Sequence, residues 1–366
     1  MPARVTDDPT RAAHAIIDRA AAGRNLERIK SVVPDAKVMA VIKANAYGHG
    51  MLRMAQSLTN ADAFAVARTD EGLSLRQCGV PQRIAVLQGF ISEEELQAHA
   101  AAGLEPVIHS DWQVNILENA RLSAPMRVWL KIDTGMHRLG ILPNEFDSVF
   151  ARLQQCESVA HPIPLMSHLA NADALDDSFT DHQLTLFRDV TKSVAAESSI
   201  ANSAGLLAWE NARSEWVRPG ISLYGVSPFP DRIGSDEDLE PVMTFRTRII
   251  SIKLAEAGSR VGYGGDWVCQ QQTLLGVAAV GYGDGYPRLA RSGTPVLIGN
   301  QRAWLAGRVS MDMITLDLSS CPDVRVGDPV TLWGQGLPVE EIATHAGTIP
   351  YDLLCGITQR VRITEQ

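Results

Sequence analysis

The sequence lacks the features that mark membrane, secreted and nucleic-acid-binding proteins. It has no window of about 18 uncharged apolar residues, so we expect no membrane span. Residues 1–30 alternate charged residues with alanines and contain no continuous apolar stretch, so we expect no signal peptide and a cytoplasmic location. No long basic run offsets the formal net charge of -9, which argues against a nucleic-acid partner.

Cysteine is also scarce. The five cysteines are scattered and odd in number, without the paired spacing of a zinc site or a disulfide framework. We therefore predict reduced thiols and no metal site, and we interpret Cys355, which lies in an apolar run, as a core residue. What remains is a chain of 366 residues with ordinary composition, long enough for one large domain and a smaller one.

Short β-like runs alternate with helix-like segments through the first 225 residues. The runs cover residues 38–43, 63–67, 84–87, 106–109, 128–133, 164–168, 200–203 and 217–224. Eight such units predict an α/β fold with a closed (β/α)8 barrel of TIM type. An open doubly wound sheet is the alternative, but no G-x-G-x-x-G turn follows the first run.

The pattern changes after an acidic, polar segment at residues 231–240. Alternating, β-rich runs separated by glycine-containing turns follow, and helical patterns become few. We therefore predict an N-terminal barrel domain over residues 1–232 and a mostly β C-terminal domain over residues 233–366.

A lone lysine follows the first apolar run. Residues 38–42 have the length and β-branched content of a buried strand, which places Lys43 at its C-terminal end. A buried ammonium must be paired, lose its proton or become covalently linked, and a neutral lysine amine can attack an aldehyde to form a Schiff base. Alternatively, Lys43 ends the strand and points into water.

Further polar residues follow other predicted strands, at the barrel end where active sites lie. Lys131 and Asp133 share one face of a strand, as partners in a salt bridge or as part of a site, and Arg138 follows with a donor fork. His168 ends the next strand and is either structural or functional.

The last two barrel strands are predicted to end beside a phosphate site. Backbone N–H groups of the turn at residues 218–221 can form a nest for a phosphate, although a Pro-Gly pair also marks an ordinary turn. Ser203 adds a hydroxyl nearby, or alternatively caps a helix. In the second domain, Tyr263 lies among three glycines that leave its phenol little shielded.

Taken together, these motifs resemble those of the alanine racemase family, the fold-type III enzymes that use pyridoxal 5'-phosphate. The matching segments, in the family's order, are residues 41–50, 131–140, 167–168, 202–203, 218–221, 261–264, 281–285, 310–312 and Tyr351. The resemblance implies a barrel that binds the cofactor, a β domain, and a homodimer with two shared active sites.

The resemblance also assigns roles to individual residues. It implies two catalytic bases on opposite faces of the substrate, Lys43 and Tyr263 of the partner subunit. The residues it assigns to the cofactor are Lys43, Tyr47, Arg138, His168, Ser203, Arg218, Gly220, Ile221 and Tyr351. Those assigned to the substrate are Arg138, Met311 and Asp312. Lys131 matches a lysine that is carbamylated in many family members.

The implied function is interconversion of L-alanine and D-alanine by an isomerase that supplies D-alanine for peptidoglycan or takes part in alanine catabolism. One alternative is a racemase of the same fold that acts on serine, lysine or several amino acids. Two large side chains, Tyr351 and Met311, favour a small substrate. The other alternative is a non-catalytic barrel that binds the cofactor, but the second domain with Tyr263 argues against it.

Overall fold

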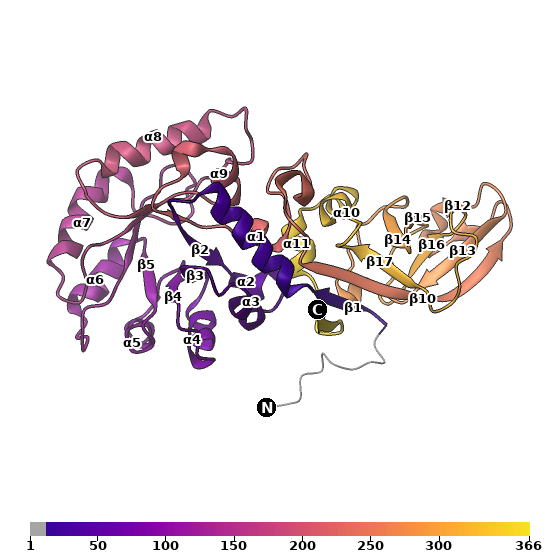
Figure 1. The fold of residues 1–366 in the computed structure, drawn as a ribbon, viewed down its shortest axis with the longest axis horizontal. Helices are drawn as coiled ribbons and strands as arrows, with labels where there is room; N and C mark the ends of the chain where they lie inside the picture. Colours follow the sequence, from indigo (N-terminus) through magenta and orange to yellow (C-terminus); the bar gives the residue numbers. More distant parts are fainter. Residues whose placement is uncertain (1–11) are drawn as a thin grey trace.

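The computed structural model describes residues 12–366. The first eleven residues, which belong to the predicted barrel domain and to the segment expected to hold no signal peptide, lie outside this range. An α/β unit and a mostly β unit lie next to each other along the long axis of the molecule (Figure 1). Among the described residues, no helix has the length and apolar character needed to cross a membrane.

The α/β unit is a closed barrel in which eight parallel strands pair in sequence order and the last pairs with the first. The strands are β2 (Lys37–Val41), β3 (Ala63–Val66), β4 (Arg83–Val86), β5 (Glu105–Ile108), β6 (Trp129–Lys131), β7 (Leu165–Met166), β8 (Ser198–Ser199) and β9 (Trp216–Val217). The predicted (β/α)8 barrel is therefore confirmed. Most strand residues are buried, because helices cover the outside and side chains fill the interior.

Nine helices of the described chain belong to the barrel unit. They are α1 (Arg19–Val32), α2 (Lys43–Tyr47), α3 (Met51–Ser57), α4 (Thr69–Gln77), α5 (Glu93–Ala102), α6 (Asp111–Asn119), α7 (Phe146–Gln155), α8 (Phe179–Thr191) and α9 (Ser203–Ala208). Side-chain caps begin three of them, α1, α5 and α9. The Ser92 hydroxyl accepts a hydrogen bond from the Glu95 amide at 3.3 Å and starts α5. Gly103, with φ of 61°, ends the same helix.

The last two barrel strands differ from their predicted extents. β9 stops at Val217, and a 3₁₀ turn, η4 (Ile221–Tyr224), replaces the rest of the predicted run, because Pro219 and Gly220 interrupt the strand. β8 lies before the predicted run. Asn202, whose side chain accepts from the Gly205 amide at 2.9 Å, caps α9, so Ser203 is not the cap.

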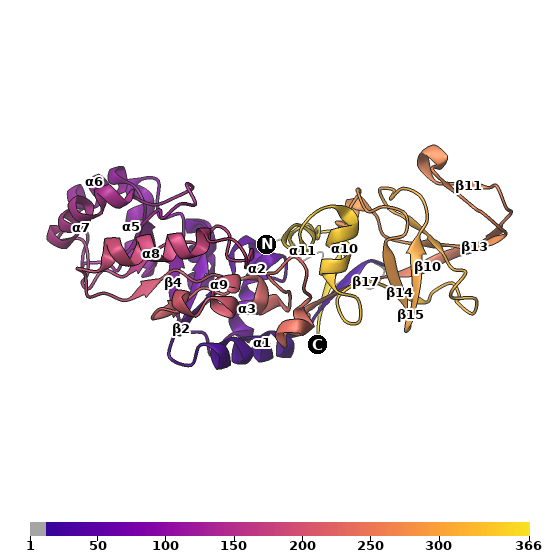
Figure 2. The same cartoon turned by 90° about the horizontal axis from the view of Figure 1, so that it is seen from above.

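The C-terminal unit is built on an eight-stranded sheet in the order β13-β16-β15-β14-β17-β10-β1-β18. Its strands are β1 (His14–Ile17), β10 (Met243–Ala255), β13 (Thr273–Ala278), β14 (Pro295–Ile298), β15 (Gln301–Leu305), β16 (Ile314–Asp317), β17 (Pro329–Trp333) and β18 (Arg362–Glu365). A small hairpin, β11 (Arg260–Val261) and β12 (Trp267–Val268), lies at the outer end, and α10 (Val339–Ala346) and α11 (Pro350–Cys355) lie beside the barrel (Figure 2). The domain boundary at residue 232 stays a prediction, and the topology adds that β1 lies in the C-terminal sheet.

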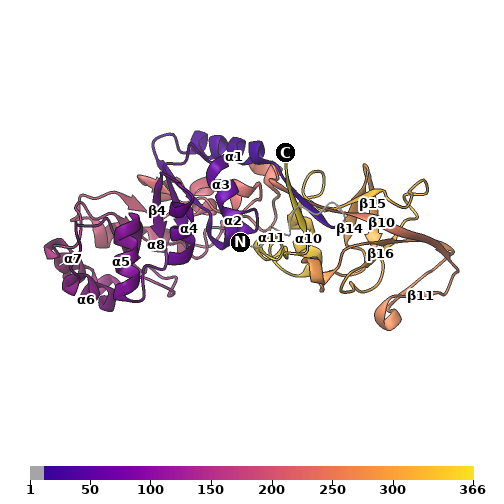
Figure 3. The same cartoon turned by 90° about the horizontal axis from the view of Figure 1, so that it is seen from below.

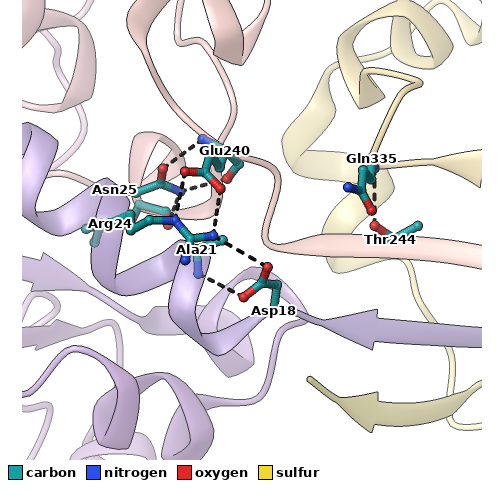
Figure 4. Close-up of polar contacts among 8 residues, drawn as sticks. Asp18, Ala21, Arg24, Asn25, Glu240, Thr244 and Gln335 are labelled. Atoms are coloured by element: carbon teal, nitrogen blue, oxygen red, sulfur yellow. Dashed lines mark hydrogen bonds and ion pairs between the residues drawn. The ribbon is translucent and has the colours of Figure 1, made fainter.

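Polar contacts join α1 to the segment that enters the second sheet (Figure 4). The buried Asn25 side chain donates to the Glu240 carbonyl and accepts from the Glu240 amide, both at 2.8 Å. Arg24 adds a two-pronged contact to the Glu240 carboxylate at 2.8 and 2.6 Å, while Asp18 caps α1. Exposed ion pairs contribute at most about 1 kcal/mol, so we assign most of the stabilisation to the buried Asn25 amide.

Candidate active site

A cavity of about 1100 Å³ lies at the C-terminal ends of the barrel strands, with α10 and α11 forming part of its wall. Many residues that the sequence singled out line it. They are Lys43, Tyr47, Lys131, Arg138, His168, Ser203, Arg218, Gly220, Ile221 and Tyr351. Because parallel strands present their C-terminal ends on one side of a barrel, residues far apart in the sequence meet here.

Lys43 is followed by a turn with a left-handed backbone conformation. The next four residues, Ala44–Tyr47, have φ between 51° and 54°, the left-handed region that costs non-glycine residues roughly 1–2 kcal/mol each. The Glu71 carboxylate accepts from the Ala44 amide at 2.7 Å, and His49 Nδ1 lies 3.0 Å from two carbonyl oxygens of the turn. Held in this way, the turn presents Lys43 and Tyr47 to the same cavity.

The Lys43 side chain is half-buried in the cavity rather than spread over the outer surface. Burial, and then the Arg138 cation, lower the pKa of Lys43 below its usual range, while Glu71 acts in the opposite direction. A lower pKa increases the fraction of neutral amine, which is the form that attacks an aldehyde.

Arg218 is buried and held by several acceptors. Its guanidinium donates to the Ser199 hydroxyl, to the carbonyls of Ser167 and Ile200, and to His168 Nδ1 at 3.3 Å. Burial lowers the pKa of Arg218 to about 9, so the group remains charged at neutral pH. Burial, and then the Arg218 cation, hold the pKa of His168 well below its usual range, so we expect a neutral imidazole.

Lys131 is a second buried lysine on the same wall. Burial, and then the cations of Arg218 and Arg138, lower the pKa of Lys131 to about 7. Within the described chain it forms no salt bridge with Asp133, whose carboxylate instead accepts the amides of Gly135 and His137 at 2.9 and 3.0 Å. The excess of positive charge favours an anionic ligand.

Hydroxyl and amide groups cluster at the end of the cavity near β8 and β9. The Ser203 hydroxyl accepts from the Gly220 amide at 3.0 Å and from the Ser222 hydroxyl at 3.0 Å. A Cβ at Gly220 would lie 2.5 Å from the Tyr47 phenol oxygen, so glycine is required where the two segments meet. Backbone amides and hydroxyls in such a cradle are suited to a phosphate.

Two tyrosines complete this end of the cavity. The rings of Tyr47 and Tyr351 lie 5.8 Å apart between centroids. Burial raises the pKa of Tyr47, and it raises that of Tyr351 to about 12, so both phenols stay protonated and can donate to an anion. The residues therefore fit pyridoxal phosphate: an amine for its aldehyde, cations for its negative charge, and donors for its phosphate.

Three predicted site residues lie outside the cavity in the single chain. Tyr263, between β11 and β12, is 68% exposed, and Met311 is 52% exposed. Asp312 pairs with Arg360 at 2.6 Å. The β11 region lies at the far end of the second sheet from the barrel (Figure 2 and Figure 3). A site that uses these residues needs a second copy of the chain, which stays a prediction.

The sequence did not reveal the place of two residues beside Lys43. Glu71 is buried and reaches back from the first turn of α4, where the only sequence signal was an acidic helix start. Cys355 was expected in the core, and this is wrong: it is exposed and lines the cavity, because Leu353 and Leu354 occupy the buried face of α11. Residues 12–366 contain no group of three or more His, Cys, Asp or Glu side chains placed to hold a metal ion.

The chain is similar to known proteins over nearly its whole length. Residues 17–228 match the family described as "Alanine racemase, N-terminal domain" and residues 242–364 match "Alanine racemase, C-terminal domain". An alanine racemase of Aeromonas hydrophila is 48% identical over 351 residues, covering 96% of this chain and 98% of the relative.

Solved structures show the same extent of similarity. The biosynthetic alanine racemase from Pseudomonas aeruginosa matches with a TM-score of 0.95 at 40% identity, covering 98% of this chain and 100% of that one. An alanine racemase from Bartonella henselae, described as having covalently bound pyridoxal phosphate, matches with a TM-score of 0.86 at 29% identity, covering 98% and 100%. The similarity thus includes the barrel, the second sheet and the junction between them.

Proposed function

The chain belongs to the alanine racemase family, and we propose that it interconverts L-alanine and D-alanine with two opposed bases, Lys43 and Tyr263 of the partner subunit. The family depends on pyridoxal 5'-phosphate. The observation that carries the residue assignments is the meeting of Lys43, the buried Arg218 and the Ser203 cradle in one cavity at the active end of the barrel.

The residues that would hold the cofactor are Lys43, Tyr47, Arg138, His168, Ser203, Arg218, Gly220, Ile221 and Tyr351. When bound, pyridoxal phosphate supplies an electron-withdrawing ring that acidifies the α-carbon of an attached amino acid. Lys43 would anchor it, and the Ser203 cradle with Tyr47 would bind its phosphate. Arg218, a donor that stays charged, would hydrogen-bond its ring nitrogen and would leave that nitrogen without a proton.

Inversion at the α-carbon requires a proton to leave one face and another to arrive at the opposite face. The lowered pKa of Lys43 favours the neutral amine that accepts a proton on its own face. Tyr263 of the partner subunit serves the other face, and His168, to which Arg218 donates, assists it. The neutral His168 ring, oriented through its Nδ1 by Arg218, presents its other nitrogen for a hydrogen bond.

We propose that Arg138, Met311 and Asp312 bind the substrate, the last two from the partner subunit. Two large side chains, Met311 and Tyr351, restrict the space beside the α-carbon and favour the methyl group of alanine. The test is α-proton exchange with a panel of L- and D-amino acids. We expect both alanine enantiomers to exchange fastest. Fast exchange with serine or lysine would indicate a broader racemase, and cofactor absorbance without any exchange would indicate a non-catalytic barrel.

We also propose a homodimer with two shared sites. Mixing Lys43→Ala chains with Tyr263→Phe chains tests it, because a heterodimer then contains one complete site. Random pairing of two inactive variants should restore about a quarter of the wild-type activity if each site uses two subunits. No recovery, with heterodimers shown to form, would place both bases in one chain.

Lys131 is the residue that we propose to be carbamylated. Its pKa of about 7 leaves much of the amine neutral, which is the form that adds carbon dioxide. The resulting carboxylate would face Arg138 and offset part of the positive charge. A carbon-13 NMR signal after labelling with bicarbonate, absent from a Lys131→Met variant, tests this proposal.

For the cellular role, we propose a cytoplasmic enzyme that supplies D-alanine to peptidoglycan. Its similarity to the P. aeruginosa protein, described as biosynthetic, supports this role. Deletion of the gene should create a requirement for D-alanine unless a second racemase is present. Loss of growth on alanine as carbon source, without that requirement, would indicate the catabolic role instead.

A further inference from the structure

Glu71 contacts the turn that follows Lys43 but does not itself line the cavity. Its side chain is buried, and its two carboxylate oxygens bind three backbone amides. One oxygen accepts from Ala44 at 2.7 Å; the other accepts from Ala67 at 2.8 Å and from Arg68 at 3.2 Å. A single carboxylate thus joins the residues that follow β2 to the residues that follow β3.

The turn that Glu71 contacts needs an external restraint. Residues 44–47 are all left-handed, and none is a glycine, so local preference opposes this conformation. At the last two residues of the turn, the buried His49 ring approaches two carbonyl oxygens, and it stacks on Tyr224 at 4.6 Å between centroids. At the first residue, Glu71 holds the backbone amide.

We propose that Glu71 is a positioning residue that keeps the 44–47 turn left-handed, so that Lys43 and Tyr47 face the cavity, and that its charge lies close enough to act on Lys43. This inference rests on the proposed function in one respect, the assignment of Lys43 as the cofactor lysine.

The charges around Lys43 indicate what loss of Glu71 would do. Arg138 and Arg218 favour the neutral amine, whereas Glu71 and Cys355 favour the ammonium; Lys131 lies on the same cavity wall. Removing the Glu71 charge should therefore lower the pKa of Lys43 further. Removing its hydrogen bonds should loosen the turn and slow every reaction of Lys43, an effect distinct from the change in pKa.

The test uses full-length Glu71→Gln and Glu71→Asp, with Glu105→Gln as the matched control. Glu105 is also a buried barrel carboxylate, but it binds Arg83 and Trp129 on the side of the barrel where the strands begin. The first readout is the rate at which added pyridoxal phosphate becomes trapped on Lys43 by borohydride, followed by peptide mass spectrometry from pH 6 to 10. The second is kcat and KM for alanine in the loaded enzyme.

For Glu71→Gln we expect a roughly tenfold lower plateau rate of trapping and a trapping midpoint at lower pH, with kcat lowered and KM little changed. Glu71→Asp keeps the charge but shortens the side chain, so its plateau should fall while its midpoint stays near that of the wild type. Glu105→Gln should lower the unfolding temperature without moving either trapping parameter.

Trapping by Glu71→Gln that matches the wild type at all pH values would overturn the proposal. An equal loss of plateau rate in Glu105→Gln would also overturn it, because the effect would then reflect stability alone. Should Glu71→Gln not fold, the plateau rate of Glu71→Asp decides. A wild-type protein that does not racemise alanine, but whose Lys43 trapping depends on Glu71 as described, would refute the proposed function and leave the positioning role standing.

Discussion

The two ends of the barrel differ in whether their charged side chains form ion pairs. At the end where the strands begin, Glu105 accepts two hydrogen bonds from Arg83, at 2.6 and 2.8 Å, and one from Trp129 at 3.0 Å. The Trp216 indole donates to Glu197 at 2.8 Å, and the Arg83 guanidinium lies 4.9 Å from the Trp216 ring centre. Arg83, Glu105 and Glu197 at this end each have a partner of opposite sign.

At the end where the strands finish, four cations form no salt bridge within residues 12–366. Lys43, Lys131, Arg138 and Arg218 line one cavity, and the pKa values of both lysines and of Arg218 are lowered. One scaffold thus holds ion-paired charges at one end and cations without ion pairs at the other. The end with the excess of cations is the one that gains by binding an anionic cofactor.

The largest expected effect is at the cavity end. Lys43→Ala should lower kcat by at least roughly a thousandfold, because it removes the proposed cofactor anchor and one of the two proposed bases. The unfolding temperature of the cofactor-free protein should not fall, since a partly buried cation is lost. Lys37→Ala is the control: it removes an exposed partner of Glu197 at the other end, and both activity and stability should stay nearly unchanged. Racemisation by Lys43→Ala at the wild-type rate would refute its assignment.

The second prediction concerns the end of the barrel where the strands begin. Arg83→Ala leaves the buried Glu105 carboxylate with Trp129 as its remaining partner, which should lower the free energy of unfolding by about 2–4 kcal/mol. Denaturant unfolding measures this loss. The kcat of the folded enzyme at 25 °C should stay within about twofold of the wild type, because the residue lies away from the cavity. A large fall in kcat would show that the two ends are coupled.

A smaller effect is expected in the phosphate cradle. Gly220→Ala places a methyl group against the Tyr47 phenol and should weaken pyridoxal phosphate binding roughly 10-fold to 100-fold. Cofactor titration measures it. Gly23→Ala is the matched control: a Cβ there meets nothing within 4 Å and lies in the middle of α1, so this variant should be slightly more stable and bind normally. Equal cofactor affinity in both variants would argue against the proposal that the groups around Ser203 and Gly220 bind the phosphate.

The smallest effect depends on pH. Lys131 has a pKa of about 7 in the folded protein against an ordinary 10.5, so the unfolded chain binds more protons between these values. The ammonium therefore destabilises the cofactor-free protein fully below pH 7, and the penalty disappears as pH rises toward 10.5. In carbon dioxide-free buffer, Lys131→Met should add on the order of 2 kcal/mol to the free energy of unfolding at pH 6 and little at pH 10. A gain that is the same at both pH values would contradict this account.

The sequence predicted the barrel and much of the cavity because both depend on local patterns. Short apolar runs that alternate with helix-like segments indicate the strands of a parallel barrel. Polar residues directly after those runs must meet at one end of the barrel. Other features depend on contacts that no local pattern encodes. The left-handed turn after Lys43 contains no glycine that would indicate it in the sequence. Glu71 reads only as an acidic residue in the first turn of a helix. Nor does the β1 sequence indicate its partners, which lie more than 200 residues away.

The position of β1 has a consequence for how the chain is completed. His14–Ile17 lies between β10 and β18, antiparallel to the first and parallel to the second. During synthesis this strand must therefore stay unpaired while the entire barrel is made, and its second neighbour, β18, follows the other strands of the sheet. A fragment that starts after residue 232 would contain β10 and β18 without the strand that separates them. Separate expression of the two units should thus require the first strand to be moved to the C-terminal fragment.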